Sequence, residues 1–232
     1  MSLRHRLIDE VRAWDARTDP GLYSILGRAN ALAVHGLECT ILRCLARAGI
    51  RDLERMRFLD VGCGIGGQLL RWIQWGARPE NCHGVDLVPE RLARARHRLP
   101  PAATLLNADA GCLPFPDLAF DVVSQLTVLS SIPDDPMQEA VTREMLRVTR
   151  PDGLILSYDF WLNPVNPATR GVRVSRLRRL FPGCRFDVHR ITLAPPIARR
   201  LAPVSPLLCR VLEGLKLLNT HHLVLIRPAR PA

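Results

Sequence analysis

The sequence lacks several features that would place it in a special class of protein. It contains no run of about 18 apolar residues, which is the length that a membrane-spanning helix needs. Its first residues include Arg4 and Arg6 instead of the apolar block of a signal peptide. Its seven cysteines are an odd number and form no C-x-x-C pair, which argues against a disulfide framework and a zinc site. We therefore expect no metal and a reducing, cytoplasmic setting.

Lysine is also nearly absent, since Lys216 is the only lysine among 32 basic residues. We attribute this bias first to genomic base composition. Residues 1–164 carry 19 arginines against 20 acidic residues, whereas residues 165–232 carry 13 basic residues against Asp187 and Glu213. The net charge of +10 therefore lies in the last third of the chain. This asymmetry indicates an anionic partner, namely a phosphorylated substrate, a nucleic acid or a membrane surface, or else a solvated basic face without a ligand.

The composition is that of an ordinary globular domain, with 47% apolar and 23% charged residues among 232. Helical spacing of apolar residues predicts helices over 3–16 and 30–48. Beyond these, short apolar strands alternate with helices, which predicts a parallel sheet with right-handed crossovers. The predicted strands are 57–61, 82–87, 103–106, 120–124, 154–158, 184–193 and 221–226, and the predicted helices between them are 68–75, 89–98 and 137–148.

We expect one domain over residues 1–232. Residues 1–50 would form an N-terminal helical lid, residues 51–160 a cofactor-binding core, and residues 161–232 an acceptor-side part. Within this last part, residues 194–220 are proline-rich and then helical, and we expect them to be an insertion that caps one end of the sheet.

A glycine-rich turn follows the first predicted strand, in the sequence Asp60-Val-Gly-Cys-Gly-Ile-Gly-Gly67. Glycines allow a tight turn from strand to helix and let a ligand approach the backbone. The same glycines satisfy the dinucleotide pattern G-x-G-x-x-G, so they alone leave a nicotinamide oxidoreductase open. Asp60 favours another ligand, because its carboxylate would repel a pyrophosphate but attract the ammonium group of an amino acid.

Two further acids follow the next two predicted strands. Asp86 ends the second strand, where a carboxylate can accept both hydroxyls of a ribose. Asp109 follows the third strand, where it can accept the amino group of an adenine. Alone, each acid has an ordinary alternative role in a turn or a helix cap. Together, Asp60, Asp86 and Asp109 lie at the carboxyl ends of successive strands, where doubly wound sheets bind ligands.

On these residues, the chain resembles the class I S-adenosylmethionine-dependent methyltransferases, of the methyltransferase-11 or methyltransferase-25 domain type, in the small-molecule or glycan-pathway branch. The resemblance covers about residues 50–160 and rests on five stretches: 60–66, Asp86, 109–116, 120–134 and 146–154. It implies a Rossmann-like α/β fold with a doubly wound sheet of seven strands, the last of which is antiparallel. It implies S-adenosyl-L-methionine as the cofactor.

The resemblance also implies which residues contact this cofactor: Tyr23, Asp60, Gly62, Cys63, Gly64, Gly66, Asp86, Leu87, Asp109, Ala110, Gln125 and Leu126. The chain departs from the family in two places. Ser130-Ser131 stands where many relatives have two histidines, so no histidine base is offered there. Ser124-Gln125-Leu126-Thr127 stands where enzymes that methylate the amino groups of nucleic-acid bases have an Asn/Asp-Pro-Pro-aromatic tetrapeptide, which argues against that activity.

The sequence names no firm catalytic base. Tyr158, Asp159, His35 and His221 are weak candidates, and each has a structural role as the alternative. Trp161 is a candidate for the acceptor pocket. Arg176 and Arg179 share a helix face and could clamp a phosphate or carboxylate of the acceptor.

We therefore expect methyl transfer to an oxygen or nitrogen of a small-molecule, glycan or lipid-linked acceptor, which the basic C-terminal third predicts to be anionic. An RNA or protein methyltransferase is a second hypothesis, although no RNA-binding appendage is recognisable. A NAD-dependent oxidoreductase and a catalytically silent scaffold are the others. Residues 197–218 mix leucines with four basic residues, so peripheral contact with an anionic bilayer is an alternative to a plain cap helix.

Overall fold

The computed structural model of the chain describes residues 8, 9, 12, 21, 24–132, 134–162 and 170–229. The chain divides into two compact units. One comprises residues 1–49 and 189–223, and the other comprises residues 50–188 and 224–232. The expected division into an N-terminal lid, a core and an acceptor-side part of a single domain stays a prediction.

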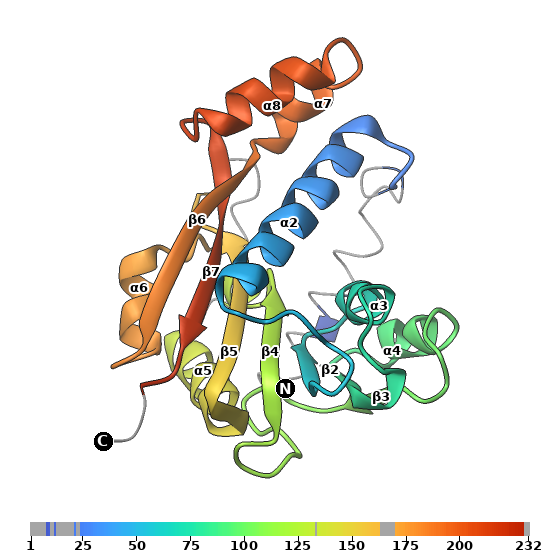
Figure 1. Ribbon diagram of the computed structural model, residues 1–232, viewed down its shortest axis with the longest axis vertical. Helices are drawn as coiled ribbons and strands as arrows, with labels where there is room; N and C mark the ends of the chain where they lie inside the picture. Colours follow the sequence, from blue (N-terminus) through green and yellow to red (C-terminus); the bar gives the residue numbers. More distant parts are fainter. Residues whose placement is uncertain are drawn as a thin grey trace. The chain divides into compact units, whose positions relative to one another are not determined.

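A seven-stranded sheet with the strand order β3-β2-β1-β4-β5-β7-β6 organises the fold (Figure 1). Strands β1 to β5 pair in parallel, and the last strand is antiparallel, as expected. The strands are β1 (Phe58–Val61), β2 (Cys82–Asp86), β3 (Thr104–Asn107), β4 (Phe120–Leu126), β5 (Thr149–Phe160), β6 (Arg185–Leu193) and β7 (Asn219–Arg227). The prediction of a doubly wound α/β sheet is therefore confirmed.

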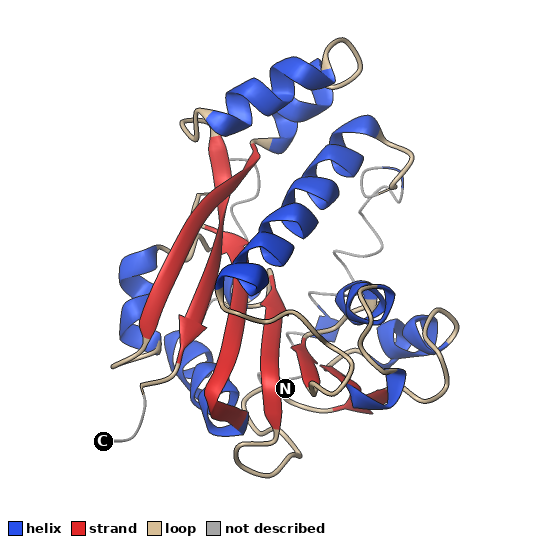
Figure 2. Cartoon of the chain, in the orientation of Figure 1, coloured by secondary structure: helices blue, strands red, loops and turns tan. Residues whose placement is uncertain are grey.

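The larger unit contains the helices that connect the parallel strands (Figure 2). They are α3 (Gly67–Gln74), α4 (Pro89–Arg96), α5 (Asp135–Val148) and α6 (Val174–Leu180), with the short 3₁₀ helices η2 (Pro79–Asn81) and η3 (Leu129–Ser131). The strand order reverses between β1 and β4. Because parallel crossovers are right-handed, α3 and α4 cover one face of the sheet and α5 covers the other. Ligands bind such sheets at this reversal, beyond the carboxyl ends of the strands.

Apolar side chains on both faces of the central strands form the core of the larger unit. All four residues of β1 are buried, as expected for a strand between two helical layers. Trp72 of α3 is fully buried and stacks on Phe58 of β1, with ring centroids 4.8 Å apart. Trp75 contacts Trp72 edge-on and is half-buried. Together these contacts fix the end of α3 against the sheet.

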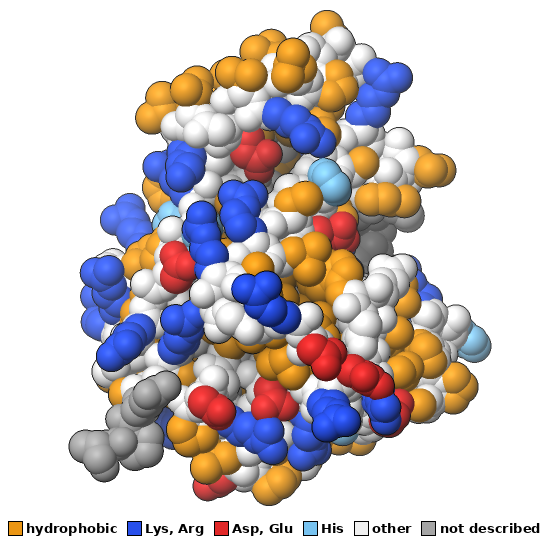
Figure 3. Space-filling model, in the orientation of Figure 1, with side chains coloured by type: hydrophobic (Ala, Val, Ile, Leu, Met, Phe, Trp, Pro, Cys, Tyr) orange, Lys and Arg blue, Asp and Glu red, His pale blue; other side chains and the backbone are white. Residues whose placement is uncertain are grey.

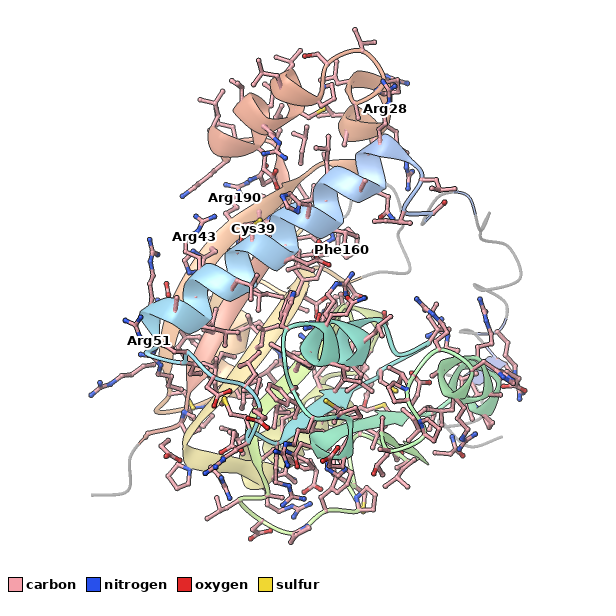
Figure 4. The ribbon with its side chains drawn as sticks, turned by 45° about the vertical axis from the view of Figure 1, so that its right-hand side comes forward. Arg28, Cys39, Arg43, Arg51, Phe160 and Arg190 are labelled. Atoms are coloured by element: carbon pink, nitrogen blue, oxygen red, sulfur yellow. The ribbon has the colours of Figure 1, made fainter. Side chains whose placement is uncertain are left out.

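The smaller unit contains the helices α2 (Arg28–Arg47), α7 (Pro195–Leu201) and α8 (Pro206–Gly214). A small apolar cluster joins α7 to α8 and to the end of β6, and it consists of Leu193, Ala198, Ala202 and Cys209. Arg28, at the start of α2, donates from its guanidinium to the carbonyl of Pro203 in the α7–α8 loop at 2.9 Å (Figure 4). Within the described residues, no helix combines the length and the apolar character that crossing a bilayer requires.

Two stretches differ from the prediction, and each has a local cause. β5 begins at Thr149 instead of Leu154, because the Pro151-Asp152-Gly153 stretch, expected to precede the strand, is an irregularity in the pairing with β4. The second part of residues 194–220 is helical as predicted, but the proline-rich first part forms a helix as well, because Pro195 occupies a first helical turn, where proline is tolerated. The helix predicted over 3–16 lies largely outside the described residues.

Candidate functional site

Asp60 is a carboxylate buried at the end of β1. Its side chain is 3% exposed, and its Oδ1 accepts a hydrogen bond of 2.7 Å from the hydroxyl of Ser124 on the neighbouring β4. Burial and, to a smaller extent, the nearby charge of Asp86 raise the pKa of Asp60 to about 7, although the Ser124 hydrogen bond and the charge of Arg71 lower it. A cation placed beside this group would therefore be stabilised by it at neutral pH.

The glycine turn after β1 has three residues in the left-handed region. Gly62, Gly64 and Gly66 have φ angles of +67°, +54° and +79°. A Cβ atom at Gly62 would collide with the side chain of Val128, and one at Gly66 would lie 2.7 Å from Leu99 Cδ1. A Cβ atom at Gly64 would meet nothing within 4 Å. Gly62 and Gly66 thus serve close packing, whereas Gly64 borders open space.

Asp86 joins this turn to the end of β2. Its Oδ2 accepts from the backbone N–H of Gly64 at 2.8 Å, and its Oδ1 accepts from the N–H of Val88 at 2.9 Å. The amide of Asn107 donates to the carbonyls of Asp86 and Leu87, both at 3.0 Å. Each carboxylate oxygen has a second lone pair, so these bonds leave Asp86 able to accept hydroxyl groups of a ligand.

Asp109 begins the turn that follows β3. Its Oδ1 accepts from the N–H of Gly111 at 2.8 Å, which fixes the turn, and Ala110 packs against the main apolar core. Asp60, Asp86 and Asp109 thus lie at the ends of three adjacent parallel strands, or just beyond them. We refer to these three residues as the acidic edge. The sequence predicted this placement, and the structure confirms it.

Gln125 and Asp159 form a buried network at the ends of β4 and β5. The Gln125 amide donates to Ser157 Oγ at 2.6 Å and to Asp159 Oδ2 at 3.2 Å, and its Oε1 accepts from the N–H of Val128 at 2.9 Å. Asp159 also accepts from the N–H groups of Ser130 and Phe160. The side chain of Gln125, predicted to contact the cofactor, therefore instead ties two strand ends to the segment that follows β4.

Asp159 is 2% exposed, and burial raises its pKa to about 6 although several hydrogen bonds lower it. Its neighbour Tyr158 is half-buried, and its carbonyl accepts from the N–H of Thr127 at 2.7 Å. Phe160, which ends β5, is labelled in Figure 4. A carboxyl group with a pKa near neutrality suits proton transfer, but the protein already occupies both of its oxygens.

The thiol of Cys63 also faces the protein interior. A Cβ atom at Gly84 on β2 would lie 2.8 Å from its Sγ, so the thiol fills the space above that glycine. Burial raises the pKa of Cys63 far above the ordinary value of a thiol. The predicted cofactor contact of Cys63 therefore falls to its backbone. The other predicted contacts, Leu87 and Leu126, are half-buried at the ends of β2 and β4.

The predicted acceptor residues differ in their surroundings. Arg176 forms ion pairs with Asp135 at 3.3 Å and with Glu139 at 3.4 Å on α5, so its guanidinium is already engaged. Arg179 is exposed, although it lies on the same helix, α6. Of the two arginines predicted to bind a phosphate or carboxylate of the acceptor together, Arg176 is therefore already paired with acidic residues of α5. Trp161 is half-buried just after β5.

The two histidine candidates belong to the smaller unit. His35 is exposed on α2, where its Nε2 lies 3.5 Å from the thiol of Cys39. His221 is 4% exposed, and burial lowers its pKa to about 3, which makes it a poor proton acceptor at neutral pH. Tyr23 lies outside the described residues. The base and acceptor assignments stay predictions.

Sequence reasoning missed Ser124, Ser157 and Asn107, which hold the acids and strand ends in place. The signal for Ser124 is its register, because it lies opposite Asp60 across β1 and β4. That register requires knowing that β1 and β4 are neighbours, although they are separated by two other strands in the sequence.

The comparison with protein families decides what this arrangement is. A family described as "Methyltransferase domain" matches residues 59–157, which include the acidic edge, the glycine turn and Gln125. This segment is therefore similar to a methyltransferase domain, in agreement with the resemblance that its sequence motifs indicate. The match implies S-adenosylmethionine as the cofactor.

Known methyltransferases resemble the chain over the same region. It is 34% identical over 122 residues to the 2-methyl-6-phytyl-1,4-hydroquinone methyltransferase of a Synechocystis strain, covering 46% of this chain and 36% of that protein. It is 34% identical over 132 residues to the 27-O-demethylrifamycin SV methyltransferase of Amycolatopsis mediterranei, covering 55% of this chain and 46% of that protein. The chain thus spans less than half of the length of these relatives.

A solved structure shows the same fold over a larger share of the chain. The S-adenosylmethionine-dependent methyltransferase of Mesorhizobium loti superposes with a TM-score of 0.57 at 20% identity, covering 78% of this chain and 94% of that one. At this identity the likeness concerns the fold alone.

The side chains of this segment fit this cofactor. S-adenosylmethionine carries positive charge on its sulfur and its amino group, and the buried Asp60, which accepts a hydrogen bond from the neutral Ser124 hydroxyl, is a carboxyl group that can pair with such a charge. Gly64 borders open space, so the cofactor can come close to the main chain of the turn there. A pyrophosphate would instead bring negative charge toward Asp60.

Proposed function

We propose that this chain transfers the methyl group of S-adenosylmethionine to a small-molecule or lipid-linked acceptor. The observation that carries the proposal is the acidic edge beside the open Gly64, in a segment that is similar to a methyltransferase domain. Asp60 would pair with the amino group of the cofactor, Asp86 with its ribose hydroxyls, and Asp109 and Ala110 with its adenine. When bound, the cofactor supplies an electrophilic methyl group on its sulfonium.

The protein's own part in this reaction is to bind and to orient. In-line displacement needs the acceptor lone pair aligned with the bond between carbon and sulfur, and it needs water excluded. The network of Gln125, Ser157 and Asp159 supports this role, because it fixes the ends of β4 and β5 and the start of η3. Its buried acid is occupied by hydrogen bonds, which favours an acceptor that loses its proton to solvent or after transfer.

Two observations support a small or lipid-linked acceptor over a polymer. The names of the two relatives above give a phytyl hydroquinone and a rifamycin as their acceptors. The chain also has none of the Asn/Asp-Pro-Pro-aromatic sequence after β4 that base-methylating enzymes use. The 13 basic residues after residue 164 favour an acceptor that carries negative charge.

Calorimetry and a transfer assay test the proposal together. S-adenosylhomocysteine should bind and NADH should not, and radioactive methyl from S-adenosylmethionine should reach an acceptor in a panel of lipid phosphates, nucleotide sugars and neutral phenols. Asp86→Ala should weaken binding by about 1–3 kcal/mol, because charged hydrogen bonds are lost. Binding without transfer to any class would favour the scaffold hypothesis. Failure to bind S-adenosylhomocysteine would overturn the proposal, and a preference for neutral phenols would remove the anionic acceptor.

A further inference from the structure

The segment from Ala194 to Leu218, which contains α7 and α8, exposes an unusual amount of apolar side chain. We call it the cap segment. Its exposed fractions range from 42% at Leu208 to 84% at Val204. The exposed large apolar residues of the cap segment are Val204, Leu207, Leu208, Val211, Leu215, Leu217 and Leu218. Single exposed leucines are ordinary, whereas seven within one short segment mark an interaction surface.

These side chains are not the packed face of a cap helix. The inner face of α8 is formed by Cys209, which is 3% exposed and packs in the small cluster with Ala198 and Ala202. At about 100° per residue, Leu207, Val211 and Leu215 project within about 80° of one another, away from Cys209. The apolar face of α8 therefore points to solvent, while a second and smaller apolar face holds the helix in place.

The geometry of α8 is fixed locally, so the exposed face is a built feature. Ser205 caps the helix, because its hydroxyl oxygen accepts from the N–H of Leu208 at 3.2 Å. Arg28 on α2 holds the preceding loop through the carbonyl of Pro203 at 2.9 Å. Both contacts lie within the smaller unit and set which side of α8 faces outward.

The charge of the cap segment is positive toward solvent. It contains Arg199, Arg200, Arg210 and Lys216, all of them exposed, and a single acid, Glu213. Glu213 faces inward, since its Oε1 accepts from the N–H of Thr192 at 2.8 Å. Figure 3 shows apolar side chains gathered over α7 and α8 with basic side chains beside them. The outward surface is thus apolar and cationic at once.

We propose that the cap segment docks on the surface of an anionic lipid bilayer. The leucines and valines would enter the boundary between headgroups and acyl chains, and the arginines and Lys216 would contact lipid phosphates. Long basic side chains suit this arrangement, because their stems lie along apolar surface while their charges reach the headgroups. The proposal needs no membrane-spanning helix and goes beyond the transfer reaction.

The charge also argues against a second copy of this chain as the occupant. A twofold dimer through this surface would place the same four cations of each copy against those of the other. An anionic bilayer instead offers many negative charges to an apolar face. An acidic protein partner would also offer negative charges, but it has no acyl layer for the apolar side chains to enter. Binding to lipid vesicles therefore distinguishes a bilayer from an acidic protein.

Vesicle flotation tests the proposal with the full chain. The probe is liposomes of phosphatidylcholine alone and of phosphatidylcholine with 30% phosphatidylglycerol (about one lipid in three anionic). The test variant is Leu207→Glu with Val211→Glu. Its matched control places the same charges at two exposed leucines outside the cap segment, Leu42→Glu with Leu118→Glu. A second pair compares Arg210→Ala and Lys216→Ala with Arg94→Ala and Arg96→Ala on α4.

Wild-type protein should float with the anionic vesicles, and its partition should fall at least tenfold for Leu207→Glu with Val211→Glu but not for the control. Loss of Arg210 and Lys216 should weaken binding more than loss of Arg94 and Arg96, and salt should weaken it too. Thermal melting and binding of S-adenosylhomocysteine should stay unchanged, which separates docking from folding and from the proposed function.

Three results would overturn the proposal. The first is equal flotation of the test variant and its control, and the second is no flotation of the wild type with anionic vesicles. The third is a dimer in light scattering that Leu207→Glu with Val211→Glu dissociates, since a second copy would then cover the face.

Discussion

At Asp60, the cost of burying a charged carboxylate conflicts with the use of that charge to bind a ligand. Its carboxyl is buried at the end of β1, where it accepts a hydrogen bond from the neutral Ser124 hydroxyl, and its pKa is raised to about 7. Ligand binding resolves this conflict if the ligand brings a cation. The pH dependence of binding therefore reports directly on the role of this residue.

Asp60 should make cofactor affinity rise with pH. Because the carboxylate form binds the ammonium group, the affinity for S-adenosylhomocysteine should increase about tenfold between pH 6 and pH 8. Asp60→Asn should remove this rise and weaken binding at pH 8 by about 2 kcal/mol through the loss of a charged hydrogen bond. Calorimetry at both pH values measures this, with the exposed Asp52→Asn as the control. A pH profile of Asp60→Asn that matches the wild type would contradict the assignment.

Gly64 and Gly76 form a matched pair for testing the glycine turn. Both have positive φ angles, +54° and +107°, and a Cβ atom at either would meet nothing within 4 Å. Alanine at each position should cost about 1 kcal/mol of stability through backbone strain. Only Gly64→Ala should also weaken S-adenosylhomocysteine binding, by at least about tenfold, because its methyl group would enter the ligand's space. Equal affinities of the two variants would show that the ligand lies elsewhere.

The elements β4, β5 and η3 depend on one another through the Gln125–Asp159 network. Asp159→Asn should destabilise the larger unit by about 1–3 kcal/mol, because the new amide group would face the donors of Gln125 and Ser130. Adding Gln125→Glu restores a donor–acceptor pair between the two positions. We expect the double variant to recover at least about half of the loss in urea denaturation. Additive losses would show that the two side chains act independently.

At this scale, the sequence predicts more of the fold than of the site. Apolar runs such as Phe58–Val61 and helical spacing such as that of α3 depend on neighbours along the chain, so the alternation of strands and helices and the position of the glycine turn followed from them. The seven-stranded sheet came from the family resemblance. The bonds between Asp60 and Ser124, and between Gln125 and Asp159, join strands that are distant in sequence. Local patterns contain no information on those registers, so the sequence did not predict these bonds.

Burial and tertiary packing change what several of the predicted side chains can do. His221 was a candidate base, and Cys63 was a cofactor contact that the resemblance implied. In the structure both are buried. Burial lowers the pKa of His221 and raises the pKa of Cys63, so both side chains are neutral at pH 7. Arg176 was predicted to bind an acceptor from its helical spacing, but its partners on α5 are set by tertiary packing.

For the whole molecule, the buried acids should make stability fall as pH rises. A carboxyl whose pKa is raised on folding binds its proton more tightly in the folded state, so its contribution is lost between the unfolded pKa near 3.8 and the folded pKa near 7. Asp60→Asn lacks this loss. The free energy of unfolding of the variant, compared with that of the wild type, should therefore increase by about 2–4 kcal/mol as the pH rises from 4 to 7. Above pH 7 this difference should stay constant.

Urea denaturation followed by the fluorescence of Trp72 and Trp75 measures this gain, since both tryptophans belong to the larger unit. Other titrating groups cancel in the difference between variant and wild type. A difference that does not change with pH would show that Asp60 keeps its ordinary pKa, and the pH dependence expected for binding would then fail as well.

The most direct measurement is a crystal structure of the full chain with S-adenosylhomocysteine. We predict that the amino group of the ligand lies at Asp60, its ribose hydroxyls at Asp86 and its adenine beside Asp109 and Ala110, and that the ligand passes over Gly64. Density for the ligand at another place, or none at a saturating concentration, would contradict it.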